Sequence, residues 1–245
     1  MAIIQRLPGT LTGPNVSGLP FYSDAPALGV PGYGYRYRAE SITAAAETTV
    51  TSWPTIAGAN ALTVPSGRTA PTLKASGSRR FVKFDGVNNV LQNAALSMTG
   101  QRTIVAVARV ADTTLATGHD ILSIASSTDI GLQKIAANNT YSAFLPGTAS
   151  RSFSDGAGGI GIWRFFAITF TATEGILYVD GNASAAVTTG LTSDMLTSLR
   201  LAYLNQPAPG NVEIAEVVTW PTALTSTEIA TVRTNLRIAQ AGLLP

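Results

Sequence analysis

The sequence predicts an all-β protein in which two antiparallel sheets face each other and one short helix closes the end of the chain. Three segments of the last third predict this fold: 163–170 and 176–182 have the composition of strands, and 213–220 runs into a capped helix. Hydrophobic residues make up 45% of the 245 residues and charged residues only 12%, so the chain can bury a large core. Sandwiches of this length commonly fold as one unit.

Short runs of strand-forming residues, separated by turn residues, follow one another from residue 35 onward. The runs 103–108 and 165–170 are apolar on both faces, which predicts central strands that are covered on both sides. The ten predicted strands are 35–42, 80–84, 103–110, 121–125, 130–135, 141–145, 163–171, 176–179, 199–204 and 212–220.

Two Asp-Gly pairs mark turns between strands. Asp180-Gly181 predicts a tight hairpin, because both residue types readily adopt the left-handed dihedrals that a two-residue turn requires. Asp85-Gly86 fits either a hairpin or a longer connection. Both aspartates therefore have a structural role.

The one predicted helix begins at a capping box. Thr225 is the N-cap and Glu228 the third helical residue, an arrangement in which each side chain bonds the other's backbone N–H. Apolar residues then recur at helical spacing, so one face of this helix is expected to pack on the sandwich. The residues of that face are Ile229, Val232 and Leu236.

Residues 1–34 are predicted to be an extended Pro/Gly-rich arm, and residues 35–245 the sandwich. Each proline fixes φ and removes a backbone donor, which keeps the arm extended. The arm is expected to anchor the protein, and the sequence leaves open whether it docks on its own sandwich or on another subunit. The anchoring residues are Ile3, Ile4, Leu7, Leu11, Phe21 and Tyr22.

Composition argues against several classes of function. The formal charge is +2 and the basic residues are scattered, so the positive stripe that binds nucleic acid is missing. Without cysteine there are no disulfides and no thiolate metal site. The first residues lack the pattern of a secretory signal, and no apolar stretch approaches 18 residues, so neither export nor a membrane partner is expected.

The sequence shows no set of catalytic, cofactor-binding or metal-binding residues, and a non-enzymatic protein is expected. Glu213 and Glu216 are three residues apart on one predicted strand, so alternation would send them to opposite faces. Glu216 is interpreted as a structural carboxylate and His119 as a surface histidine. A calcium site stays open because carbonyl ligands leave no trace in a sequence. Its carboxylates would be Asp112, Asp120 or Asp129.

The segments in this order resemble the laminin-G-like branch of the concanavalin A-like jelly rolls. The resemblance covers about residues 35–240 and implies a two-sheet jelly-roll sandwich. The matching segments are 39–42 with 51–53, 71–91, 103–110, 163–170, 176–182 and 214–236. Relatives commonly carry carboxylates near Trp53-Pro54-Thr55 and Asn88-Asn89-Val90-Leu91, where this chain has none, which weakens any inherited calcium site.

Members of this family bind sugars, mediate adhesion or form surface parts of tailed-phage virions, so the fold alone does not decide the function. The leading expectation is a non-catalytic structural or decoration protein on the virion surface, on capsid or tail. It would be made in the host cytoplasm, bound to major capsid or tail protein through its arm, and homo-oligomeric.

The alternative is a carbohydrate-binding or adhesion module that recognises cell-surface glycans. Aromatic rings beside amide side chains are the expected chemistry for sugar binding. The candidate contact residues are Trp53, Asn88, Asn89, Tyr141 and Tyr203.

Overall fold

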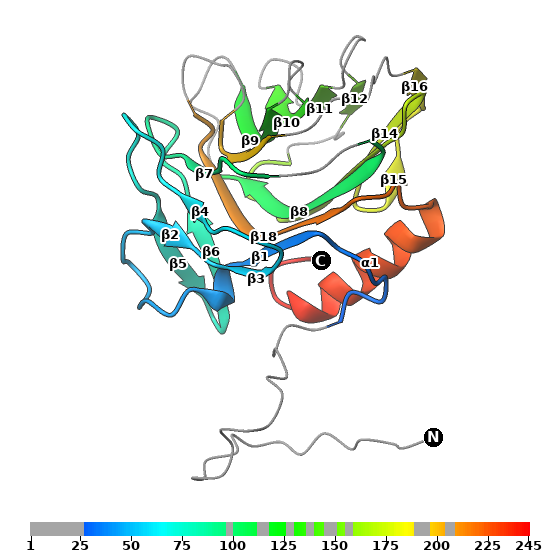
Figure 1. The fold of residues 1–245 in the computed structure, drawn as a ribbon. Coiled ribbons are helices and arrows are strands. Elements are labelled where there is room, and N and C mark those ends of the chain that lie inside the picture. Colours follow the sequence, from blue (N-terminus) through cyan, green and yellow to red (C-terminus); the bar gives the residue numbers. More distant parts are fainter. Residues whose placement is uncertain are drawn as a thin grey trace.

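The computed structural model describes residues 27–96, 100–111, 118–125, 130–135, 140–144, 151–154, 159–188, 197–203 and 209–245. Within these residues, two antiparallel sheets lie face to face, and helix α1 (Ser226–Ala239) covers the outer face of one of them (Figure 1). The predicted all-β, two-sheet sandwich with one C-terminal helix is confirmed.

Sheet A is the sheet that carries the helix. Its strands run in the order β15-β14-β13-β8-β18-β1-β3, with β16 beside β14, and with β6 and then β5 beside β18. The strands are β1 (Tyr35–Arg38), β3 (Thr55–Ala57), β5 (Thr72–Ser76), β6 (Arg79–Lys83), β8 (Arg102–Val110), β13 (Arg164–Phe170), β14 (Glu174–Val179), β15 (Asn182–Ala183), β16 (Val187–Thr188) and β18 (Val212–Trp220).

Sheet B is the opposite layer, with the strand order β12-β11-β10-β9-β17-β7-β4-β2. Its strands are β2 (Ser52–Trp53), β4 (Leu62–Thr63), β7 (Leu91–Asn93), β9 (His119–Ala125), β10 (Ile130–Ile135), β11 (Thr140–Phe144), β12 (Arg151–Ser154) and β17 (Ser198–Leu201). The predicted strand 35–42 ends earlier than expected, because a single 3₁₀ turn, η1 (Ala39–Ser41), follows β1.

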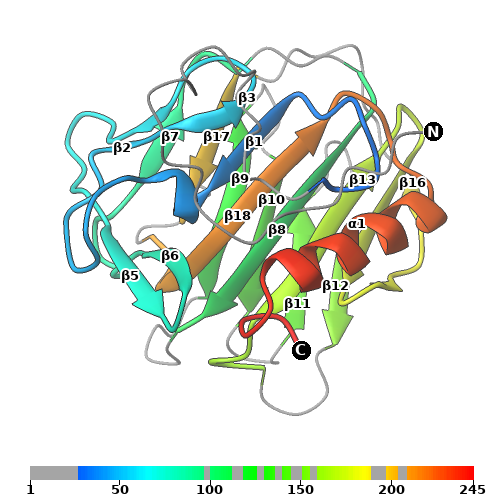
Figure 2. The same cartoon turned by 90° about the horizontal axis from the view of Figure 1, so that it is seen from below.

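Sheet A has a hydrophobic layer on each of its faces. In β8, Ile104 and Ala106 belong to the inter-sheet core, whereas Val105 and Val107 belong to the helix-side core beneath α1. Both faces of this strand are therefore covered, which is why its sequence is apolar throughout. Figure 2 shows α1 lying across the strands of sheet A.

Helix α1 begins at the predicted capping box. The side chain of Thr225 accepts a hydrogen bond from the backbone N–H of Glu228, and the Glu228 carboxylate accepts one from the backbone N–H of Thr225. The predicted apolar face is buried in the helix-side core. Its residues are Ile229, Val232 and Leu236.

The last residues of the predicted arm, 27–34, pack on the sandwich. Leu28 and Val30 are buried in the helix-side core. The Asn235 side chain donates a hydrogen bond to the Leu28 carbonyl over 3.2 Å, and the Trp220 indole N–H donates to the Val30 carbonyl over 3.4 Å. The packed part of the chain therefore starts before residue 35.

Glu213 and Glu216 lie on the same, helix-bearing face of sheet A, so the expectation that they point to opposite faces is wrong. The pairing of β18 with β8 shifts register at Ala215, which is one extra residue in the strand and reverses the alternation beyond it. Glu213 pairs with Arg109, which stacks on two rings of the helix-side core, and Glu216 bonds Gln240 at the end of α1.

The two Asp-Gly turns differ. Asp180 and Gly181 have φ of 50° and 86° and join β14 to β15, as predicted for a tight hairpin. Asp85 instead accepts hydrogen bonds from the backbone N–H groups of residues 87–89, which builds a longer loop after β6. In the described part of the chain, no helix has the length and apolar character needed to cross a membrane.

Candidate ligand-binding site

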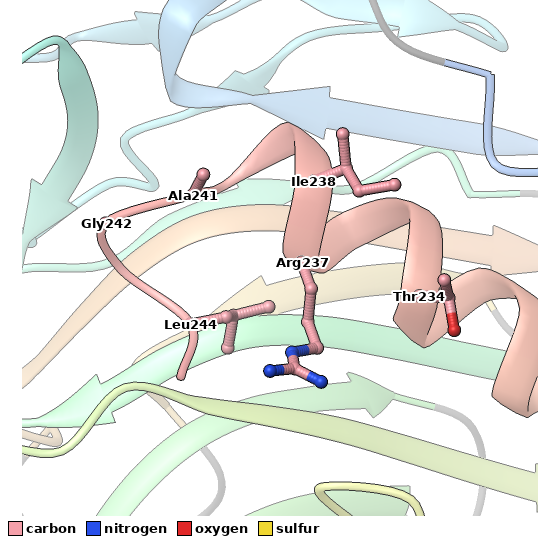
Figure 3. A pocket seen from close by; sticks show the side chains of 6 residues that line it. All are labelled: Thr234, Arg237, Ile238, Ala241, Gly242 and Leu244. Atoms are coloured by element: carbon pink, nitrogen blue, oxygen red, sulfur yellow. The ribbon is translucent and has the colours of Figure 1, made fainter.

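One hollow, with a volume of about 510 Å³, lies where α1 ends and the chain turns back. Figure 3 shows that its lining side chains do not converge, because Ile238 and Arg237 point to different sides of the helix. Ile238 is 68% exposed. A small ligand would find no set of polar groups directed at one point there.

Another hollow, of about 210 Å³, lies on the outward face of sheet B. Gln92 of β7 and Arg200 of β17 are direct cross-strand partners. The residues that flank Arg200, Leu199 and Leu201, are buried in the inter-sheet core, so Arg200 and Gln92 point the other way. The hollow is lined by Pro65, Ser66, Arg68, Val90, Gln92, Arg200 and Tyr203, and is called the arginine pocket below.

Two arginines stack on one tyrosine in the arginine pocket. The guanidinium carbon of Arg68 lies 4.5 Å from the centroid of the Tyr203 ring, and that of Arg200 lies 5.8 Å from it. Arg68 also donates a hydrogen bond from Nη1 to Oδ1 of Asn88 over 3.1 Å. The ring thus contacts both cations, and the hydrogen bond to Asn88 holds one of them.

The turn after β17 sets the position of Tyr203. Ala202 has a φ of 60°, a left-handed conformation that costs a residue with a Cβ about 1 kcal/mol or more. Two backbone hydrogen bonds hold Ala202, one to the carbonyl of Ile121 and one from the N–H of Gly210. The carbonyl of Tyr203 accepts a hydrogen bond from Ser123 of β9. The strained turn therefore directs Tyr203 over the outward face of sheet B.

The arginine pocket is positively charged. Within the described residues, neither Arg68 nor Arg200 forms an ion pair with a carboxylate, whereas Arg36, Arg109 and Arg164 all do. Both pocket arginines are only partly exposed. Partly desolvated charges in a concave site act more strongly on a ligand than charges in open water.

The five predicted glycan-contact residues do not form one site in the structure. Tyr203 lines the arginine pocket and Asn88 supports it. Asn89 is buried, and its amide donates to Thr69 and to the Ala70 carbonyl, which makes it a structural residue of the loop.

Trp53 and Tyr141 are wrong as surface contacts, because both are fully buried in the inter-sheet core. The Trp53 indole donates to the Arg38 carbonyl over 2.8 Å, and the Tyr141 hydroxyl donates to the Gly159 carbonyl over 3.2 Å. Sequence reasoning missed Arg68, Gln92 and Arg200. One feature of the sequence could have indicated Arg200: it lies between two apolar residues of a strand, in Leu199-Arg200-Leu201, so it points away from the core.

The other predicted residues divide between described and undescribed parts of the chain. All the predicted anchoring residues, Ile3 to Tyr22, and the calcium candidates Asp112 and Asp129 lie outside the described residues. Asp120 is buried on β9. His119 is buried too, so its interpretation as a surface histidine is wrong. Among the described residues, no three His, Asp or Glu side chains come together as a metal site would require.

The two glutamates of β18 share a face, yet each is neutralised by arginine. Glu213 pairs with Arg109, and Glu216 pairs with Arg36 and Arg38. The Glu216 side chain has 0% exposure and accepts a hydrogen bond from Gln240, the residue after α1. Its interpretation as a hydrogen-bonded structural carboxylate is confirmed.

Fold and site together define a β-sandwich with a polar, positively charged pocket on the outward face of one sheet. No family model matches the sequence, and no curated protein sequence is similar to it. Solved structures share its fold. Trypanosoma rangeli sialidase in complex with the inhibitor DANA matches with a TM-score of 0.64 at 15% identity, over 84% of this chain and 33% of that chain.

The binding domains of botulinum neurotoxins are also similar. Serotype D matches with a TM-score of 0.58 at 11% identity, and serotype G with 0.57 at 15%, each over 84% of this chain and 51% of the other. At these identities the likeness shows the fold alone. This chain spans about a third of the sialidase chain and half of the neurotoxin chains. A virion location stays a prediction from the sequence.

Proposed function

We propose that this sandwich is a carbohydrate-binding module and that sugars bind in the arginine pocket. One observation carries the proposal: five of the seven described residues that line the pocket have hydrogen-bonding side chains, and they border one hollow on the outward face of sheet B. Pro65 and Val90 supply apolar contact beside them. Sugars present hydroxyls and C–H groups close together, and such a mixed lining is suited to both.

The fold neighbours support this proposal at the level of the class of function. One of them is a sialidase in complex with sialic acid, at 16% identity and a TM-score of 0.61, and others are binding domains of neurotoxins. The volume of about 210 Å³ is below the 300 to 1,000 Å³ of pockets for drug-sized ligands, so the pocket accommodates one sugar residue.

We further propose that the module is non-catalytic. The paired carboxylates that glycoside hydrolysis commonly uses, about 5 to 9 Å apart, have no counterpart among the described residues that line the arginine pocket. The lining residues can bind and orient a sugar. They offer no carboxylate to protonate or attack it.

A glycan array probed with the whole chain tests the proposal. We expect selective binding, which Tyr203→Ala weakens about tenfold because the two arginines lose the ring that holds them. Tyr203→Phe keeps the ring and loses only the hydroxyl, so it is expected to bind more tightly than Tyr203→Ala. Unchanged melting temperatures would show that both variants are folded. An array without any selective binding would contradict the proposal.

The finer expectation from the sequence, attachment to the surface of a tailed-phage particle, remains a second proposal. It rests on the family resemblance, and one structural observation favours it: residues 27–34 are fixed on the helix side, away from the arginine pocket. Capsid or tail protein would be the partner, and homo-oligomers would form there. Mass spectrometry of purified particles should detect the protein in them, and its absence from particles would contradict this role.

A further inference from the structure

We propose that the arginine pocket selects sugars that carry a carboxylate, an inference that rests on the proposed carbohydrate-binding function and names its ligand class. Arg68 and Arg200 would bind the carboxylate, while Gln92 and Ser66 bind hydroxyls of the same sugar residue. Tyr203 is a positioning residue, since it holds both guanidinium groups.

The first argument is charge balance. Two guanidinium groups stack on one ring, at 4.5 and 5.8 Å, and no carboxylate in the described part of the chain forms an ion pair with either. Like charges held close together in a partly desolvated pocket repel each other. A bound anion removes that repulsion, whereas a neutral sugar leaves it unchanged. The pocket therefore favours an anionic ligand over a neutral one of the same shape.

The second argument is the number of free donors. A guanidinium group has five N–H donors, and Arg68 uses one of them on Asn88. Within the described residues, the side chain of Arg200 donates no hydrogen bond. The planar fork of arginine matches the two oxygens of a carboxylate, and such charge-assisted bonds are about twice as strong as neutral ones.

The third argument is that the carboxylate of such a sugar lies close to its hydroxyl groups. In an acidic sugar, the carboxylate is bonded directly to the ring. The pocket has room for about one such ring, and the amide of Gln92 is the cross-strand neighbour of Arg200. A single acidic sugar residue can therefore reach the arginines and the neutral polar groups together.

The test uses the whole chain and matched pairs of glycans. The probes are oligosaccharides ending in N-acetylneuraminic acid or in a hexuronic acid, the methyl esters of both, and sulfated and neutral counterparts. We expect binding of at least one of the two acids, and at least tenfold weaker binding of its methyl ester. Comparing the two acids shows whether the pocket binds the carboxylate of a sialic acid or that of a hexuronic acid. Binding should weaken as salt increases.

Variants link that selectivity to the pocket. Arg68→Gln and Arg200→Gln are each expected to weaken binding of the acid about tenfold, while binding of the methyl ester changes little. Arg237→Gln is the matched control, since it also removes one positive charge but lies exposed on α1, outside this pocket. It should bind as the unmodified chain does. Circular dichroism and melting temperatures would identify any variant that fails to fold.

Each contrary outcome has its own meaning. Equal binding of acid and methyl ester, or binding of sulfated glycans alone, would overturn the carboxylate inference while leaving the proposed function standing. Binding of acids that both arginine variants retain would overturn the assignment to this pocket. If no glycan of any kind binds, both the inference and the proposed function fail.

Discussion

Arg36 of β1 and Glu216 of β18 form a buried ion pair across neighbouring strands of sheet A. Nη2 of Arg36 lies 2.6 Å from Oε1 of Glu216, and the two side chains are 1% and 0% exposed. The other carboxylate oxygen accepts a hydrogen bond from Gln240 over 2.8 Å and lies 3.4 Å from Nε of Arg38. Burial raises the pKa of Glu216, and the two arginines act against that rise. One carboxylate thus joins two strands to the end of α1.

Glu216→Gln is expected to lower the free energy of unfolding by about 3 kcal/mol, because the buried Arg36 loses its counter-charge and Arg38 keeps only Glu40. Thermal and urea unfolding measure the loss. Glu47→Gln is the control: its pair with Lys74 is exposed, and such pairs contribute at most about 1 kcal/mol. Equal melting temperatures for the two variants would contradict the structural role of Glu216.

Because Tyr37 is buried and titratable, we expect the folded protein to lose stability in alkaline solution. Its hydroxyl donates to the Asn60 carbonyl and accepts from Asn93, and burial raises its pKa to about 12. A raised pKa means that the folded protein holds this proton more tightly. The stabilisation of the fold by the protonated Tyr37 is therefore fully present below a pH of about 10. Roughly 2 to 3 kcal/mol of it is lost as the pH rises toward about 12.

Urea unfolding at several pH values measures this slope. Tyr37→Phe has no proton to lose, so its stability should fall less steeply between pH of about 10 and 12. At neutral pH the same variant is expected to be less stable by about 1 kcal/mol, because Asn60 and Asn93 each lose a hydrogen-bond partner. A variant with the same alkaline slope as the unmodified chain would rule out Tyr37 as the cause.

The capping box of α1 gives a third prediction. Thr225→Ala should cost about 1 kcal/mol, since it leaves the backbone N–H of Glu228 without its acceptor. The hydrogen bonds from Thr225 hold the pKa of Glu228 below its ordinary value. Their stabilisation is present above that ordinary pKa and is lost as pH falls through the lower, folded-state value.

Thr234→Ala on the exposed side of the same helix is the control for that substitution. Alanine has the higher helix propensity, so this variant should be as stable as the unmodified chain or slightly more stable. Calorimetry of both variants in the same buffer gives the comparison. Equal losses at Thr225 and Thr234 would show that the capping box is not the cause.

A fourth prediction compares two shortened chains, 27–245 and 35–245. The shorter one lacks Leu28 and Val30, two side chains of the helix-side core, and should be less stable by about 3 kcal/mol or more. It also loses the hydrogen bond from Trp220 to Val30. Urea unfolding of both chains measures the difference. Equal stabilities would mean that residues 27–34 add nothing to the fold.

Local chemistry could be predicted from the sequence because it acts between near neighbours. The capping box at Thr225, the hairpin at Asp180-Gly181 and the doubly covered strand β8 each depend on residues within one short window. Their signals are therefore complete in the sequence.

Features that depend on distant residues could not be predicted in this way. The bulge at Ala215 appears only in the pairing of β18 with β8, and it changes the face on which Glu216 lies. Arg68 and Tyr203 meet across sheet B although they are far apart in the chain. Nothing near Trp53 distinguishes a buried indole from an exposed one, because its partner is the carbonyl of Arg38 on another strand.

The chain enters and leaves the described sandwich on one side. Leu28 rests on α1, and Leu243 and Leu244 pack into the same layer, while Arg200 faces outward from the opposite sheet. A partner fused to the C-terminus would accordingly sit on the side of the sandwich opposite the arginine pocket. Immobilising the protein by a C-terminal tag should leave the arginine pocket turned toward the solution, where even bulky glycan chains could reach it.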